Sequence, residues 1–86
     1  MSNADIKMIH LHQDLLTVQR ERLEKEVSVF DGVTLARFSY SLKHWLVVVY
    51  DADSINANTI LNRVRQWDRN ATIFWTNVIN EMNVFK

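Results

Sequence analysis

The feature that most constrains the fold of this chain is an apolar run that leads into a turn and a helix cap. Residues 44–50 are rich in β-branched and aromatic side chains, which predicts a strand with at least one buried face. Asp51, Asp53 and Ser54 follow the run, and these residue types are typical of turns and of helix caps. We therefore expect a strand over residues 44–50 and a helix over residues 54–67.

Four further segments continue the alternation of strands and helices. Residues 6–12, 34–40 and 72–79 are apolar or alternate in polarity, as strands do. From about residue 16 the pattern becomes helical, and Asp31-Gly32 is expected to end this first helix because glycine accepts left-handed backbone there. The apolar stripe of the helix consists of Leu16, Leu23, Val27 and Phe30.

The order of these elements, β-α-β-β-α-β, predicts an α+β fold of the ferredoxin-like sandwich type. Right-handed crossovers place the strands in the order 4-1-3-2 in one antiparallel four-stranded sheet, with two helices on one face. The sequence contains no proline and no linker, so we expect residues 1–86 to form a single domain.

Charge and composition argue against several classes of function. Ten basic and ten acidic residues cancel, so no overall field draws the chain to nucleic acid or to an anionic membrane. No apolar stretch approaches the roughly 20 residues of a membrane span, and we expect no direct membrane insertion. The chain has no cysteine, which removes disulfides, thiolate metal sites and a cysteine nucleophile and favours a cytoplasmic location.

Three segments resemble a heavy-metal-associated domain, the module of small metallochaperones and of the N-terminal domains of copper and zinc pumps. They are the helix end at residues 30–33, the strand end at residues 46–51 and the helix over residues 54–64, and the resemblance covers about residues 6–79. In that family two cysteines between the first strand and the first helix bind a soft metal ion. The corresponding positions here are about Leu16 and Gln19, and neither side chain can replace a thiolate. The resemblance therefore implies the family fold without its metal site or its activity.

The chain is also similar, from the first helix onward, to the cytoplasmic C-terminal domain of cation-efflux transporters. That domain is ferredoxin-like and dimeric as well. The strand expected over residues 6–12, which precedes the first helix, favours the heavy-metal-associated pattern.

His10 and His12 are candidate ligands for a transition metal. One residue separates them, so on a strand both imidazoles point to the same side, where they could bind zinc, copper or nickel. Two ligands make half of a tetrahedral site, the third histidine, His44, is distant in the sequence, and Asp14 is the carboxylate closest to the pair. Histidines without a ligand are the alternative interpretation.

No residue pattern marks a catalytic or cofactor site. Serine, histidine and aspartate occur without the spacing of a nucleophile elbow, and no glycine-rich loop could hold a phosphate. Trp45 on a central strand raises the question of RNA binding, but the aromatic signature is absent, and Val47 and Val49 beside it offer no stacking planes. We therefore expect no enzymatic activity, no cofactor and no nucleic acid partner.

The face of the sheet away from the helices is expected to be apolar, although a face that meets water is normally polar at alternate positions. A patch of this kind, on the order of several hundred Å², usually marks an interaction surface. We therefore predict a non-catalytic protein-interaction or dimerisation module, which forms a homodimer or binds a partner protein through this face or the edge of the fourth strand. One alternative is that residues 80–85 fold across the face, and another is a transition-metal carrier or sensor that uses His10 and His12. The residues expected in the interface are Trp45, Val47, Val49, Leu35, Phe74 and Trp75.

Overall fold

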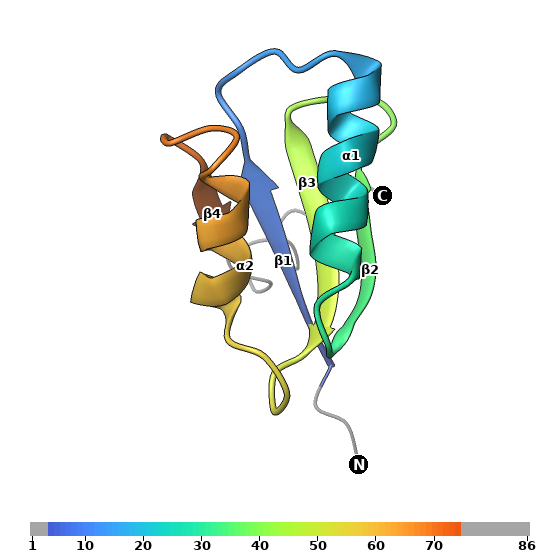
Figure 1. Ribbon diagram of the computed structural model, residues 1–86, viewed down its shortest axis with the longest axis vertical. Helices are drawn as coiled ribbons and strands as arrows, with labels where there is room; N and C mark the ends of the chain where they lie inside the picture. Colours follow the sequence, from blue (N-terminus) through green and yellow to red (C-terminus); the bar gives the residue numbers. More distant parts are fainter. Residues whose placement is uncertain (1–3, 75–86) are drawn as a thin grey trace, which may run out of the picture.

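The computed structural model describes residues 4–74 and has an α+β fold with four strands and two helices (Figure 1). The element order is the one that the sequence predicts. In chain order the elements are β1 (Ala4–His10), α1 (Thr17–Ser28), β2 (Val33–Phe38), β3 (Trp45–Asp51), α2 (Ala57–Val64) and β4 (Thr72–Phe74).

The four strands form one antiparallel sheet in the order β2-β3-β1-β4, which reads 4-1-3-2 from the β4 edge. Ile9 of the central strand β1 pairs with Leu46 of β3 on one side and with Ile73 of β4 on the other. On the outer strand β2, the register shifts between Val33 and Leu35. Such a bulge bends an edge strand and weakens it as a template for further strand pairing.

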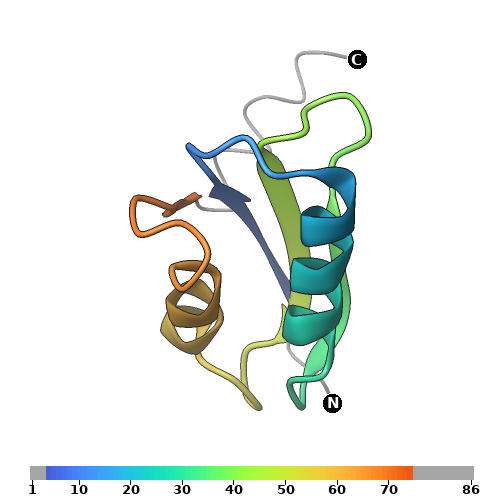
Figure 2. The ribbon, with the colours of Figure 1, turned by 45° about the horizontal axis from the view of Figure 1, so that its top comes forward.

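Both helices lie on the same face of the sheet, with α1 over the β2 and β3 side and α2 toward the β4 side (Figures 1 and 2). The hydrophobic core fills the space between the helices and the sheet. Within residues 4–74, no helix or strand covers the opposite face. The fully buried apolar side chains of the core are Ile9, Leu11, Leu23, Val27, Leu46, Val48, Ile60, Val64 and Ala71.

The first strand lies two residues earlier than predicted. It ends at His10, because the next N–H groups bind elsewhere: the Leu11 N–H donates to the His44 carbonyl, 2.8 Å away, and the N–H groups of His12 and Gln13 donate to the Asp68 carboxylate. Asp68 therefore determines where the chain leaves the sheet.

The first helix is shorter than predicted at both ends. Leu16 is the residue before the helix and is 65 % exposed, while Leu15 is buried, so the assignment of Leu16 to the core stripe is wrong. Gly32 does have left-handed backbone, with a φ of 94°, but it lies in the turn into β2 rather than at the helix end. A Cβ at this position would lie 2.8 Å from the Ser54 Cβ. Glycine is therefore also needed at position 32 because the β3–α2 loop packs directly against its backbone.

The second helix begins at Ala57 rather than at residue 54 and ends three residues before Trp67. Its cap is Asn56, whose side chain accepts a hydrogen bond of 2.7 Å from the Asn58 N–H. Ser54, one of the three residues predicted for the turn and the cap, donates its hydroxyl to the Asp51 carboxylate and stabilises the preceding turn.

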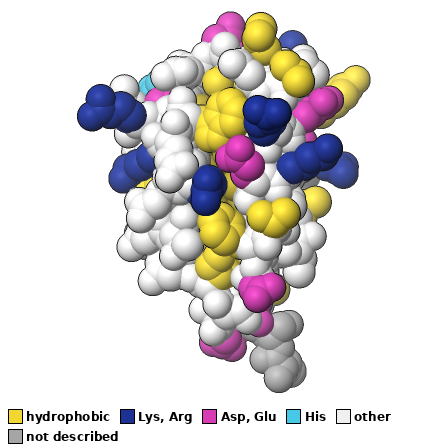
Figure 3. Space-filling view, in the orientation of Figure 1, with side chains coloured by type: hydrophobic (Ala, Val, Ile, Leu, Met, Phe, Trp, Pro, Cys, Tyr) yellow, Lys and Arg dark blue, Asp and Glu magenta, His cyan; other side chains and the backbone are white. Residues whose placement is uncertain are grey.

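Hydrophobic side chains also form a stripe on the outer surface between the two helices, flanked by charged residues (Figure 3). Trp67 donates its indole N–H to Glu26 of α1 at 2.9 Å, and the Arg63 guanidinium of α2 lies 5.9 Å from the centre of the Phe30 ring. Each of these contacts connects one helix to the segment that follows the other helix. Neither helix in the part of the chain described has the length and apolar character needed to cross a membrane.

Candidate functional site

The strongest candidate site is the face of the sheet opposite α1 and α2, which we call the open face. Along β3, Leu46, Val48 and Tyr50 turn toward the helices and are buried, so Val47 and Val49 turn the other way. The same alternation applies to the other three strands. The apolar residues of the open face are Ile6, Met8, Leu35, Trp45, Val47, Val49 and Phe74.

Strand pairing makes these side chains neighbours across the sheet. Leu35 of β2 lies opposite Val49, while Met8 of β1 lies opposite both Val47 and Phe74. Three members that lie on different strands are exposed: Ile6 at 42 %, Leu35 at 40 % and Phe74 at 37 %. Five of the six predicted interface residues thus share one continuous surface. The sixth, Trp75, lies outside the described residues. The same holds for the rest of the predicted fourth strand, up to residue 79, and for residues 80–85.

An aromatic cluster occupies one end of the open face. The Trp45 ring lies 4.7 Å from the His10 ring and 5.0 Å from the Phe74 ring, measured between ring centres. Trp45 and Phe74 come from strands on either side of β1, so the cluster bridges three strands. Its rings are tilted at 51° and 60° rather than parallel, which is ordinary packing of aromatic side chains.

Charge is sparse on the open face. Among the outward-facing residues of the four described strands, only Arg37 and Asp51 carry side chains that are always charged near neutral pH. Arg37 lies on the edge strand β2, and the Asp51 carboxylate accepts hydrogen bonds from the Asp53 N–H and the Ser54 hydroxyl in its own turn. The middle of the surface is therefore neutral and apolar.

The two candidate metal ligands are neighbours, and the fold adds a third histidine that the sequence placed far away. The His10 ring lies 4.9 Å from the His12 ring and 6.2 Å from the His44 ring. His44 arrives there because its neighbour Trp45 pairs with His10. The Nδ1 of His44 lies 3.0 Å from the Leu11 carbonyl, and its Nε2 lies 3.7 Å from the Asp14 carboxylate. Over residues 4–74, however, no group of three or more metal-binding side chains is arranged to hold an ion.

The environment at this end of the sheet lowers the pKa of His10. Burial lowers the pKa of His10, and the nearby His12 and His44 imidazoles lower it further. The Asp68 carboxylate acts in the opposite direction but has the smallest effect.

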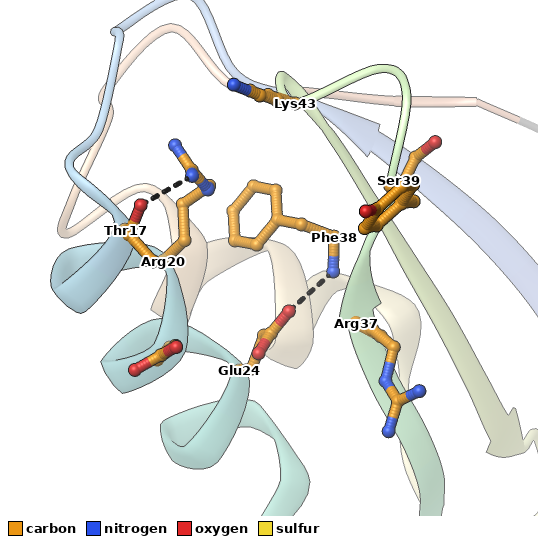
Figure 4. Close-up of a pocket in the computed structure, with 9 residues that line it drawn as sticks. Thr17, Arg20, Glu24, Arg37, Phe38, Ser39 and Lys43 are labelled. Atoms are coloured by element: carbon orange, nitrogen blue, oxygen red, sulfur yellow. Dashed lines mark hydrogen bonds between the residues drawn. The ribbon is translucent and has the colours of Figure 1, made fainter.

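A separate pocket of about 490 Å³ lies between the start of α1 and the end of β2 (Figure 4). Two of its five charged side chains are engaged in the fold: Arg20 donates to the Leu15 carbonyl and the Thr17 hydroxyl, and Glu24 accepts from the Phe38 N–H at 2.7 Å. The Arg37 side chain extends away from Arg20 in this view. The pocket therefore combines opposite charges without a set of groups that converge on one ligand.

Two polar clusters that sequence analysis missed hold the fold rather than a ligand. Asp5 and Lys7 face the helices, with 3.0 Å between the Lys7 ammonium and the Asp5 carboxylate, which also accepts from the Tyr50 hydroxyl at 3.2 Å. Burial would raise the pKa of Asp5, but hydrogen bonds from Lys7 and the Ile6 N–H outweigh it, so the pKa is lowered. Burial and the Asp5 charge raise the pKa of Tyr50 to about 12. The alternation of side chains along a strand could have predicted this cluster, because it puts Asp5 and Lys7 on the same face as the core residue Ile9.

The second cluster is centred on Asp68, a carboxylate that is only 1 % exposed. It accepts hydrogen bonds from the N–H groups of His12, Gln13 and Asn70. Burial would raise the pKa of this carboxyl, but the three donors outweigh it and lower the pKa. No local pattern in the sequence connects Asp68 to residues more than fifty positions earlier, so only the fold identifies this role.

No protein-family model and no curated protein matches this sequence. The open face, rather than a relative of known activity, is therefore the basis for a functional proposal.

Proposed function

We propose that this chain is a non-catalytic protein-interaction module that forms a homodimer through the open face. The observation that carries the proposal is the continuous apolar surface that strand pairing assembles from β1, β2, β3 and β4. This apolar face spans all four strands, and no helix or strand of residues 4–74 covers it. Such a face is unusual for a sheet that meets water. Burial of the face in a dimer removes apolar area from water, and each Å² contributes roughly 25 cal/mol to the free energy of association. The loss of translational and rotational freedom opposes this gain.

A second copy of the chain is the partner that the charge distribution supports best. In a dimer with two-fold symmetry the same surface faces itself, so any charge near its centre would meet an identical charge. The centre of the open face has none, and Arg37 lies on the edge strand, where water remains available. A partner recognised by its charge would need a charged surface, which the described strands do not provide on this face.

The proposal includes a fold of the ferredoxin-like type and a distant relationship to heavy-metal-associated domains. The β-α-β-β-α-β order and the strand order 4-1-3-2 support it. At the positions of the family cysteines, Leu16 is exposed and the Gln19 side chain accepts a hydrogen bond of 2.8 Å from the Leu16 N–H. These positions serve the start of α1, which is consistent with a cytoplasmic relative that has no thiolate metal site.

Sedimentation velocity of the wild-type chain and two charge variants tests the proposal. The wild type should be a dimer at high micromolar concentration, and Trp45→Glu should be a folded monomer, because a charge buried in a dry interface is costly. Leu35→Glu provides a second variant, since this side chain is 40 % exposed on the edge strand β2. Val18→Glu is the matched control: Val18 is 67 % exposed on α1, so this variant should remain a dimer.

The proposal fails if the wild type sediments as a monomer at high micromolar concentration. If, in addition, the Trp45 fluorescence of that monomer is shifted to the blue, the face is covered within one chain, which is the alternative predicted for residues 80–85. Titration with zinc, copper and nickel tests the metal carrier: micromolar or tighter binding that is lost in His12→Ala would favour that function instead.

A further inference from the structure

One row of side chains crosses the whole open face at right angles to the strands. Strand pairing places Arg37 of β2 opposite Val47 of β3. Val47 lies opposite Met8 of β1, and Met8 lies opposite Phe74 of β4. The row thus begins with a cation at the β2 edge, crosses two apolar side chains and ends with an aromatic ring at the β4 edge. Neighbouring strands lie about 4.8 Å apart, so about 14 Å separate the two ends of the row.

Both ends of the row are available to a partner. Arg37 is exposed and alternates with the buried residues Ala36 and Phe38. Within residues 4–74, no hydrogen bond or ion pair holds its guanidinium. Phe74 is 37 % exposed, and its ring contacts Trp45 at 5.0 Å between ring centres. A guanidinium and an aromatic ring attract each other, so the two ends of the row are complementary.

We propose that the two-fold axis of the homodimer runs parallel to the strands, midway between β1 and β3, so that Arg37 of each protomer lies on Phe74 of the partner subunit. This inference rests on the proposed homodimer and adds the orientation of its two copies. Independent sheets that pack face to face keep their strand directions within about 30°. An axis midway between the two central strands lays four strands over four and reverses the row. The cation therefore meets the aromatic ring twice, and Val47 meets Met8 of the partner subunit.

The other aligned orientation has its axis across the strands, and it lays each strand over its own copy. If that axis lies on the row, Arg37 meets Arg37 of the partner subunit, and like charges repel. If it crosses the middle of β3, the Trp45 end of one copy meets the Asp51 end of the other. The negative face of an aromatic ring repels a carboxylate. An axis parallel to the strands avoids both contacts, because it keeps Trp45 and Asp51 at opposite ends of the interface.

A double-mutant cycle on the dimer Kd, measured by sedimentation equilibrium, tests this orientation. Arg37→Gln removes the charge and Phe74→Leu removes the ring, and each should raise the Kd about 10-fold, because a dimer contains two such contacts. The double variant should have the Kd of the weaker single variant, since both changes remove the same contact. Within one chain the two residues are too far apart to couple in this way. Arg22→Gln on the exposed side of α1 is the control and should leave the Kd unchanged.

Cysteine cross-linking tests the same orientation by distance, and the sequence has no cysteine of its own to interfere. A mixture of Arg37→Cys and Phe74→Cys, one of them labelled with nitrogen-15, is treated with a short bismaleimide, and mass spectrometry identifies the products. The mixed dimer should cross-link. Neither variant should cross-link with itself, because its two thiols would lie about 14 Å apart along the sheet. Circular dichroism verifies that every variant is folded.

The possible outcomes separate the orientation from the homodimer itself. Losses that multiply in the double variant, or an unchanged Kd in Arg37→Gln, overturn the orientation and leave the homodimer intact. Cross-linking of each variant with itself also overturns it and indicates an axis across the strands. A wild-type chain that is monomeric at high micromolar concentration overturns both proposals.

Discussion

The two faces of the sheet are built from the same strands and from similar side chains, yet they have different environments. Val47, Val48 and Val49 are three identical consecutive residues on β3, and only Val48 is fully buried. On β1 the usual pattern is partly reversed, because Asp5 and Lys7 face the helices whereas Ile6 and Met8 face away. The middle of the open face is thus apolar, as the core is, although no part of residues 4–74 covers it. Folding of a single chain does not require apolar side chains at uncovered positions.

The largest expected difference comes from placing the same charge on the two faces. Val48→Asp should prevent folding or cost roughly 4 kcal/mol or more, because it buries an unpaired carboxylate between the sheet and the helices. Val47→Asp should leave the monomer folded and abolish the dimer. Chemical denaturation together with sedimentation velocity measures both effects. If Val47→Asp also unfolds the chain, the open face belongs to a core within one molecule and is not an interface between two.

The buried carboxylate at the end of β1 should give the next largest effect. Asp68→Ala removes the acceptor of three N–H groups and leaves them without their partner, at a cost of roughly 2–3 kcal/mol. Asp14→Ala is the matched control, with an expected change within about 0.5 kcal/mol because that side chain is 90 % exposed. Urea denaturation distinguishes them, and equal losses in the two variants would contradict the role of Asp68.

Gly32→Ala should cost about 2 kcal/mol, since alanine is strained at a φ of 94° and its Cβ would lie 2.8 Å from the Ser54 Cβ. Ser54→Gly removes that close contact but also the Ser54–Asp51 hydrogen bond, so Gly32→Ala is measured in the Ser54→Gly background, where it should cost less in thermal unfolding. An equal cost of Gly32→Ala in both backgrounds would mean that backbone strain alone accounts for the effect.

The smallest expected effect is the pH dependence that comes from the polar group on the helix side. The pKa of Asp5 is lowered in the folded chain, so its contribution to stability is present above the ordinary carboxyl pKa and is lost as the pH falls through the lowered value. Tyr50 has the opposite sign: with a pKa raised to about 12 from 10, its contribution is present below pH 10 and is lost as the pH rises through 12. Asp5→Asn should reduce the acid slope of the unfolding free energy relative to the control Asp14→Asn, and an unchanged slope would refute the assignment.

Alternation and spacing were sufficient to predict the element order and the faces of the central strands. They failed at the ends of two elements. The strand β1 ends early because the distant Asp68 accepts from the next N–H groups, and α2 is capped at Asn56 while Ser54 donates to Asp51 in the preceding turn. The composition of the open face could be predicted because strand periodicity assigns it residue by residue. The proximity of His44 to His10 could not, since it depends on the β1–β3 register.

The most direct test of the central claim, that the open face is an interaction surface, is a dilution series followed by NMR of the labelled chain. Backbone signals of Leu35, Val47 and Val49 should shift together on dilution from high to low micromolar concentration, while those of the outer residues of α1, such as Val18, stay constant. Shifts confined to α1 and α2, or signals of the open face that do not change over the whole range, would contradict the account.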